Sequence, residues 1–127
     1  MKTLKHLVNF ITTVIIVVAI LFLGLYLYGI RPYVVLSGSM EPKIETGSLS
    51  FINTKTRYES IKEKDIIAFK LNDGTMVTHR VIKVTDDGFE TKGDANDVKD
   101  EIMTTKNNYV GKNIFSIPKV GYAVSLV

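Results

Sequence analysis

Hydrophobic and polar positions divide the chain into two unlike parts. From Leu7 to Ile30 the sequence is almost continuously apolar and carries no charge. A helix of about 20 such residues is long enough to cross a hydrocarbon core of roughly 30 Å. Lys2 and Lys5 precede this stretch, which favours a cytoplasmic N-terminus and an extracytoplasmic remainder. We expect residues 1–30 to hold the cytoplasmic N-terminus and a single-pass membrane anchor, and residues 31–127 to form an extracytoplasmic domain.

A cleaved secretory signal is the alternative interpretation of this N-terminal stretch, because it also begins with positive charge. Its apolar core, however, usually has only about 7 to 15 residues. The run here is longer, and Arg31, Pro32 and Tyr33 separate it from the small residues that follow. We therefore favour an uncleaved anchor.

After Pro42 the apolar residues occur in short segments, several of them alternating with polar residues, and Gly, Asp and Asn separate the segments. Alternation with a period of two predicts strands that bury one face. Asp73-Gly74 and Asp87-Gly88 predict tight hairpin turns. Residues 54–63 are predicted as a loop or a short helix, which the pattern does not decide. The fold class is mainly β, with strands expected at residues 47–52, 65–70, 76–84, 89–92 and 109–117.

Composition excludes several kinds of site and partner. The chain has no cysteine, so disulfides, zinc thiolates and a thiol nucleophile are excluded. Its two histidines, His6 and His79, are too few for a multi-histidine metal centre, and we expect neither a metal nor a cofactor. Lys2 and Lys5 account for most of the net charge of +3. The remaining domain is nearly neutral and has no basic stripe, which argues against nucleic acid as a partner.

Three short motifs contain residue types that are typical of a serine hydrolase. They are S-G-S-M-E-P at 37–42, T-H-R-V at 78–81 and K-G-D-A-N at 92–96. A serine hydroxyl attacks only when a base accepts its proton. His79 is the only histidine of the domain, and histidine is the residue type suited to act as a base at neutral pH. His79 also shares a strand face with Val77 and Val81, so a buried, neutral histidine is the competing interpretation.

These motifs resemble those of the type I signal peptidases. The resemblance is to the branch typical of the endoplasmic reticulum, archaea and some Gram-positive bacteria, which carries histidine where most bacterial members use lysine. It implies a membrane-bound serine endopeptidase that removes signal peptides from exported preproteins after small residues. Its mostly β domain would lie against the outer face of the bilayer. Signal peptides and the lipid bilayer are then the expected partners. Many members of this branch continue into a second apolar helix, and whether such a helix follows Val127 stays open.

The same resemblance implies roles for five residues, four within the motifs and one, Asp100, four residues after the third motif. Ser39 would be the nucleophile, with its backbone N–H and the Ser37 hydroxyl as oxyanion donors. His79 would be the general base. Asp100 is the first choice for the acid of the triad and Asp94 for a supporting residue, although the assignment between the two aspartates stays open.

Two other functions fit parts of the sequence. A non-catalytic, membrane-anchored β domain that binds exported or wall proteins would account for the anchor and the strands. A Ser-Lys hydrolase would use Lys70 or Lys83 as a desolvated base; Lys83 lies four residues from His79 on the predicted strand. Neither alternative explains why serine, histidine and aspartate motifs occur together in the order of the family.

Overall fold

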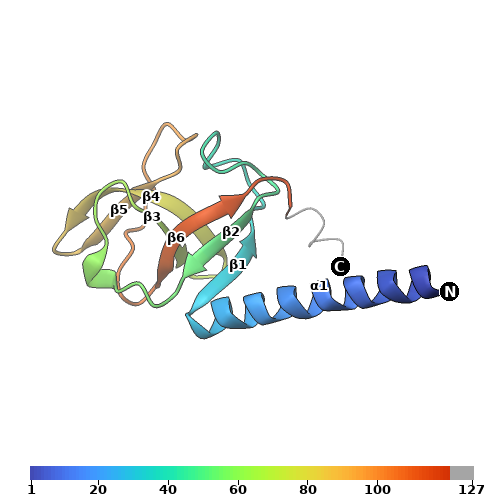
Figure 1. Cartoon of the computed structure of the whole chain (residues 1–127). Coiled ribbons are helices and arrows are strands. Elements are labelled where there is room, and N and C mark those ends of the chain that lie inside the picture. Colours follow the sequence, from blue (N-terminus) through green and yellow to red (C-terminus); the bar gives the residue numbers. More distant parts are fainter. Residues whose placement is uncertain (121–127) are drawn as a thin grey trace.

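The computed structural model describes residues 1–120, so the last seven residues of the predicted domain lie outside the described part. Helix α1 spans Lys2–Leu27 and projects from a β domain (Figure 1). It is long and apolar enough to cross a membrane. The helix ends three residues before the last residue of the apolar stretch, Ile30. Tyr28 caps the helix, and Gly29 then takes a φ of +81°, a left-handed conformation that suits glycine after a helix end.

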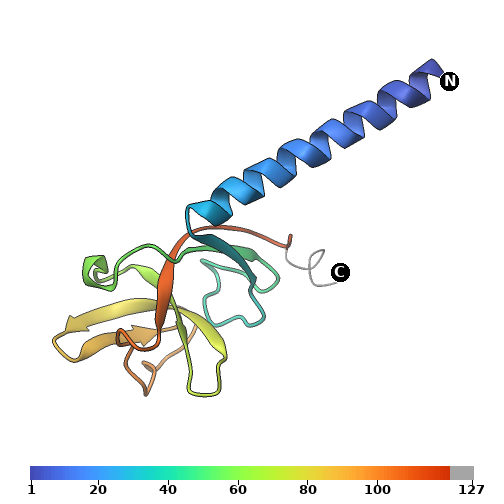
Figure 2. The same cartoon turned by 90° about the horizontal axis from the view of Figure 1, so that it is seen from below.

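The β domain is one six-stranded antiparallel sheet with the strand order β1-β2-β6-β3-β4-β5 (Figures 1 and 2). Five strands were predicted to within two residues at either end. The bounds of all six strands are β1 Ile30–Val34, β2 Leu49–Asn53, β3 Ile66–Lys70, β4 Met76–Thr85, β5 Gly88–Lys92 and β6 Tyr109–Ile117. The undecided segment between β2 and β3 contains loops and a short 3-10 helix, η1, at Tyr58–Ser60.

Strand β1 was not predicted. It includes Ile30, the last residue of the apolar stretch, and it contains Pro32. Proline cannot donate a hydrogen bond to a neighbouring strand and is therefore largely confined to sheet edges. Within residues 1–120, strand β1 lies at the edge of the sheet and pairs with β2 alone, so Pro32 is compatible with its position. The chain thus passes from the helix into the sheet with only two residues between them.

The two edges of strand β4 are paired over different parts of the strand, and this leaves part of one edge free. Its first half pairs with β3 from Met76 to Arg80, whereas β5 pairs with the other edge only from Arg80 to Thr85. On that second edge, residues 76–79 have no strand partner among the described residues. Unpaired backbone groups at a sheet edge can accept another extended segment.

The two faces of the sheet bury separate hydrophobic clusters. One contains Ile67, Phe69 and Val81, together with Phe89 from β5. The other contains Ile66 on the opposite side of β3, packed against Met40 and Ile44 from the segment between β1 and β2. Because side chains alternate along a strand, the neighbouring residues Ile66 and Ile67 of β3 belong to different clusters. This alternation determines which residues surround each functional side chain.

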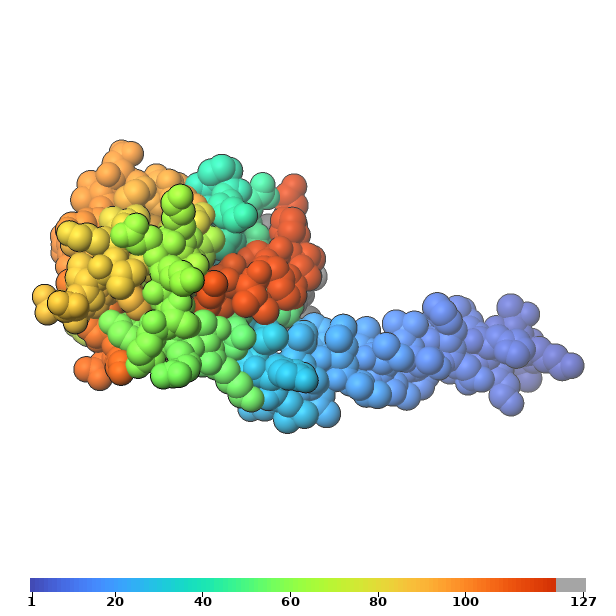
Figure 3. All heavy atoms as spheres, turned by 60° about the vertical axis from the view of Figure 1, so that its left-hand side comes forward, coloured from blue at the N-terminus to red at the C-terminus, as the bar shows by residue number. Residues whose placement is uncertain are grey.

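The end of α1 is bound directly to the domain. The Lys55 side chain donates to the carbonyl of Leu27 (2.8 Å), and the Arg31 guanidinium donates to that of Tyr26 (2.7 Å). Arg31 also stacks on the Tyr26 ring, and Thr54 donates to the carbonyl of Gly29 through both its backbone and its hydroxyl. The last carbonyls of a helix have no partner within it and carry partial negative charge. Two cations satisfy them here, and the rest of the helix projects away from the domain (Figure 3).

Candidate active site

Ser39 lies in the turn between β1 and β2, and two neighbouring segments fix its backbone. Within the turn, Glu41 N–H donates to the carbonyl of Gly38 (3.1 Å) and Ile44 N–H to that of Met40 (2.9 Å). From the loop after β5, Ala95 N–H donates to the carbonyl of Ser39 (2.9 Å). The burial of Met40 and Ile44 in the second cluster explains why this serine-containing turn has a defined position.

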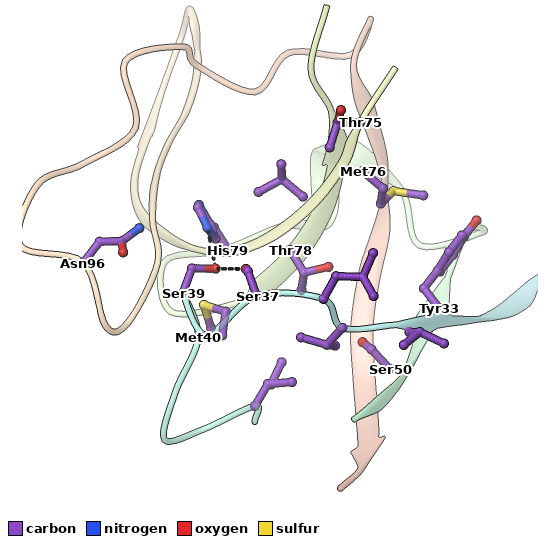
Figure 4. Close-up of a pocket in the computed structure, with 15 residues that line it drawn as sticks. Tyr33, Ser37, Ser39, Met40, Ser50, Thr75, Met76, Thr78, His79 and Asn96 are labelled. Carbon is purple, nitrogen blue, oxygen red and sulfur yellow. Dashed lines mark hydrogen bonds between the residues drawn. The ribbon is translucent and has the colours of Figure 1, made fainter. Parts of the chain in front are cut away.

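His79 lies on the first half of β4 and is buried, at 8% exposure. The period of two predicted its side of the strand: it lies at the edge of the Phe69 ring, with the ring centroids 6.1 Å apart. Its Nε2 lies 3.1 Å from Ser39 Oγ, and its Nδ1 lies 2.6 Å from Asp100 Oδ2 (Figure 4 for the serine contact). The structure therefore brings together the predicted serine, histidine and second aspartate.

The hydrogen-bond directions around His79 are mutually consistent. With the neutral imidazole protonated on Nδ1, that nitrogen donates to Asp100 and Nε2 accepts the Ser39 hydroxyl proton. The Ser39 oxygen can then accept from the Ser37 hydroxyl, 3.2 Å away. This arrangement can move a proton from a serine to a histidine whose other nitrogen faces a carboxylate.

Asp94 occupies a different place. The Arg80 guanidinium donates to both its carboxylate oxygens, at 2.8 Å each. These hydrogen bonds are the main reason why the pKa of Asp94 is lowered and the pKa of Arg80 is raised. A third nitrogen of Arg80 donates to the carbonyl of Lys64. Asp94 is thus held by a permanent cation, and neither ring nitrogen of His79 is its hydrogen-bond partner.

Sequence reasoning missed two residues of this site. Thr91 is fully buried on β5, and its hydroxyl donates to Asp100 Oδ2 (2.6 Å). Gly93 lies against Ser39 and His79: a Cβ there would stand 2.6 Å from the Ser39 carbonyl oxygen and 3.1 Å from His79 Nε2. The motif at 92–96 contains Gly93, but only the packed structure shows why that position has no side chain.

A cleft of about 550 Å³ opens beside the serine and histidine (Figure 4). One wall is the segment from Tyr33 to Ser37, and the other is the free edge of β4 from Thr75 to His79. Met40 and Ile44 also line the cleft. A second, smaller cavity of about 270 Å³ adjoins His79 and Asp100. The surface of the larger cleft is mostly apolar.

The lysine alternative gains no support from the structure. Lys70 and Lys83 are both exposed, and among the described residues the recorded side-chain partners of the Ser39 hydroxyl are Ser37 and His79. A lysine becomes a useful base where burial disfavours its charged form, and neither of these side chains is buried. Within residues 1–120 there is also no cluster of His, Cys, Asp and Glu that could hold a metal ion.

Comparisons with known proteins identify a family and several similar sequences. A family model described as signal peptidase, peptidase S26, matches residues 5–116. Signal peptidase I W of Bacillus subtilis (strain 168) is 40% identical over 78 residues, which cover 58% of this chain and 41% of that protein.

The eukaryotic relatives align over more of the chain. The signal peptidase complex catalytic subunit SEC11C of Homo sapiens is 40% identical over 101 residues, covering 69% of this chain and 52% of that protein. SEC11 of Colletotrichum graminicola is 31% identical over 106 residues, covering 74% and 62% respectively. The chain spans about half the length of the curated relatives that it matches.

Proposed function

This chain belongs to the signal peptidase family, peptidase S26, and on that premise we propose that it is a membrane-bound serine endopeptidase that removes signal peptides from exported preproteins. The observation that carries the proposal is the hydrogen-bonded series Ser39, His79 and Asp100 at the side of an apolar cleft. A nucleophile, a base and an orienting carboxylate within reach of one another are what acyl transfer requires.

In the proposed mechanism, Ser39 Oγ attacks the carbonyl carbon of the scissile peptide bond while His79 Nε2 accepts its proton. Asp100 holds the imidazole through Nδ1 and stabilises the cation that forms. His79 then gives the proton to the leaving amine as the C–N bond breaks, and an acyl ester remains on Ser39. A water molecule, deprotonated by His79, hydrolyses the ester and releases the signal peptide.

The negative oxygen of the tetrahedral intermediate needs donors close to Ser39. We assign the Ser39 backbone N–H and the Ser37 hydroxyl to this role. In support, Ser37 Oγ already lies 3.2 Å from Ser39 Oγ and lines the cleft, so a rotation about one side-chain bond can redirect its proton to a neighbouring oxygen. Such preoriented donors contribute roughly 10²–10³ in rate per group in related hydrolases.

The proposed substrates match the position of the cleft relative to α1. Nine residues from Ile30 reach Ser39, and an extended chain of that length covers at most about 30 Å. The site therefore stays close to the end of the anchor. We propose that the N-terminus is cytoplasmic and that the domain faces the opposite side, where the end of a translocated signal peptide emerges. Cleavage after small residues is part of the same proposal.

The non-catalytic alternative is less well supported. A domain that only binds exported proteins has no need of a histidine hydrogen-bonded on both ring nitrogens at the wall of a cleft. A satisfied core histidine needs one backbone or side-chain acceptor, whereas His79 faces a serine on one side and a carboxylate on the other. We therefore propose a peptidase and not a binding domain.

Cleavage of a signal-peptide substrate by the detergent-solubilised full chain tests the proposal. Ser39→Ala should abolish product release and leave the unfolding free energy within about 0.5 kcal/mol of wild type, because only a partly exposed hydroxyl is lost. Ser60→Ala is the matched control, since this serine lies on η1 and bonds only to the Arg57 carbonyl. Unchanged cleavage by folded Ser39→Ala would remove Ser39 as the nucleophile.

Membrane orientation is tested separately with intact spheroplasts and with opened vesicles. Protease added to the outer face should digest the β domain, because the positive flank precedes the apolar run. Digestion only from the cytoplasmic side would contradict the proposed access to translocated substrates.

A further inference from the structure

Asp100 belongs to a segment that cannot position it unaided. The chain between the end of β5 at Lys92 and the start of β6 at Tyr109 contains no strand or helix, apart from one isolated bridge between Thr104 and Phe89. The Asp100 side chain is 21% exposed. Loop backbones are more mobile than the elements they connect, so a carboxylate there needs an attachment to the sheet if it is to keep one orientation.

Thr91 is the residue that supplies this attachment. It lies opposite Val81 in the β4–β5 register, and Val81 shares its face of β4 with His79. Thr91 and His79 are therefore diagonal neighbours on one face, with backbones about 7–8 Å apart. A single carboxylate oxygen fits between a hydroxyl and an imidazole at that separation. The strand pairing thus sets the gap that Asp100 fills.

Two hydrogen bonds join Thr91 to Asp100. The Thr91 hydroxyl donates to Oδ2 (2.6 Å), the same oxygen that meets His79 Nδ1 (2.6 Å). The Asp100 backbone N–H donates to the Thr91 carbonyl (2.8 Å). One bond fixes the backbone and the other fixes the rotation of the carboxylate. Because threonine is branched at Cβ and stiff at χ1, its hydroxyl is itself held in place.

Burial alone does not explain this contact. Thr104, in the loop that carries Asp100, is as fully buried as Thr91. Its hydroxyl has no hydrogen-bond partner among the described residues. The fold therefore tolerates a buried threonine whose hydroxyl is unpaired. The pairing of Thr91 with the carboxylate is a specific feature of the site.

We infer that Thr91 is a positioning residue of the peptidase reaction, which orients Asp100 toward His79. This inference rests on the proposed function. Without the Thr91 hydroxyl, the Asp100 carboxylate can rotate away from His79 Nδ1. The imidazole is then less well oriented, which lowers turnover. The histidine cation is also less stabilised by the carboxylate, so the neutral base is available down to a lower pH.

Thr91→Val tests the inference because it replaces the hydroxyl by a methyl group of similar size. We expect kcat/KM to fall about 10- to 100-fold, as for loss of an outer-shell hydrogen-bond partner, and the acidic limb of its pH profile to move to lower pH. Thr91→Ser keeps the hydroxyl and should stay close to wild type in both. The other charged groups around the pair, Arg80 with Asp94, Lys92 and Glu101, are unchanged in every variant.

Thr104→Val is the matched control, since it makes the same chemical change at an equally buried position with no bond to lose. It should leave kcat/KM and the pH profile unchanged. Full activity in Thr91→Val would overturn the inference. Equal losses in Thr91→Val and Thr91→Ser with an unmoved pH profile would also overturn it, because they would assign Thr91 a packing role only.

The proton resonance of His79 Nδ1–H separates this inference from the proposed function. In wild-type protein the short bond to Asp100 should place that signal far downfield. It should move in Thr91→Val and stay in place in Thr91→Ser and Thr104→Val. That result in a protein that cleaves no signal peptide would refute the peptidase proposal but keep Thr91 as the orienting partner of Asp100. An unmoved signal in Thr91→Val would overturn the positioning role whether or not the protein cleaves.

Discussion

Two neighbouring residues of β4 form hydrogen bonds with two aspartates of one loop, and the two pairs differ in the charge of the β4 side chain. His79 meets Asp100 on the buried face, beside the Phe69 ring. Arg80 meets Asp94 on the other face, where its guanidinium also bonds to the Lys64 carbonyl. A guanidinium is always charged, so the charge of Asp94 is compensated at all times. The recorded donors to the Asp100 side chain are a hydroxyl and an imidazole, so a full positive charge arises beside it only when His79 is protonated.

This comparison explains which of the two carboxylates suits catalysis. Stabilisation that appears only in the transition state accelerates a reaction, whereas stabilisation present throughout does not. The cation that Asp100 meets forms during the attack, and the cation that Asp94 meets is permanent. We therefore expect the first pair to contribute to rate and the second to the position of the loop that carries Gly93 and Ala95.

Replacing each aspartate gives the largest effect and the most direct test of this division. Asp100→Ala should reduce turnover by about 10⁴, the cost of losing the acid in a Ser-His-Asp enzyme, with little change in melting temperature. Asp94→Ala should lower activity less and destabilise the loop more. Turnover and thermal melting measured on the same preparations separate the two outcomes.

Asp97→Ala is the control for both variants, because this aspartate is exposed on the same loop and should have little effect. If folded Asp94→Ala is inactive while Asp100→Ala keeps full activity, the roles are reversed. If both keep full activity, the Ser-His-Asp mechanism itself has to be abandoned.

Gly93 lies between the two pairs, and Gly93→Ala should have the next largest effect. The added Cβ would stand 2.6 Å from the Ser39 carbonyl oxygen, which is backbone and cannot move away freely. A displaced nucleophile can cost roughly 10² in turnover, and overpacking about 1–3 kcal/mol of stability. Both are measured by cleavage assays and urea unfolding in detergent.

Gly24→Ala offers the comparison, because a Cβ at this helical position meets nothing within 4 Å. It should be neutral or slightly stabilising. Wild-type turnover in Gly93→Ala would show that the contact between this loop and the nucleophile is not needed for activity.

The smallest expected effect is the pH dependence of the Arg80–Asp94 pair. The hydrogen bonds from Arg80 lower the pKa of Asp94 in the folded protein. The stabilisation is therefore complete above the ordinary aspartate value of about 3.9 and is lost as the pH falls through the lower folded value. The difference in unfolding free energy between wild type and Asp94→Asn should be about 1 kcal/mol near pH 7 and should shrink below about pH 4.

Urea unfolding at a series of pH values measures this difference, with Asp97→Asn as the exposed control. If the difference in unfolding free energy between wild type and Asp94→Asn is as large below pH 4 as near pH 7, the ion pair is not the source of that difference.

Most of the sheet could be predicted from the sequence, because β2 to β6 carry alternating or compact apolar segments between turn residues. Strand β1 could not, since Ile30 continues the apolar stretch and Pro32 argues against a strand when its edge position is unknown. Apolarity does not mark the helix end at Leu27 either, because the apolar stretch continues to Ile30, whereas the backbone turns at Gly29.

The candidate site was predictable as far as its residues belong to local motifs. Ser39, His79 and Asp100 could be proposed because their types and order resemble those of a family. Thr91 could not be proposed, because a threonine in a strand is ordinary and its partner lies in an irregular loop. The choice between Asp94 and Asp100 depended on which face of β4 each aspartate reaches. That is a property of the loop path between residues 93 and 104, which periodicity does not describe.

If α1 crosses the bilayer as proposed, its hydrogen bonds to the sheet make the thickness of the bilayer relevant to the proposed reaction. A helix longer than the local hydrocarbon layer tilts to fit it. Lys55, Arg31 and Thr54 bind the last turn of α1 and Gly29, and only two residues join helix to sheet. The β domain must then follow the helix when its tilt changes. A thinner membrane would lower one side of the cleft toward the lipid headgroups and a thicker one would raise it, so lipid composition would set the height at which an emerging peptide meets Ser39.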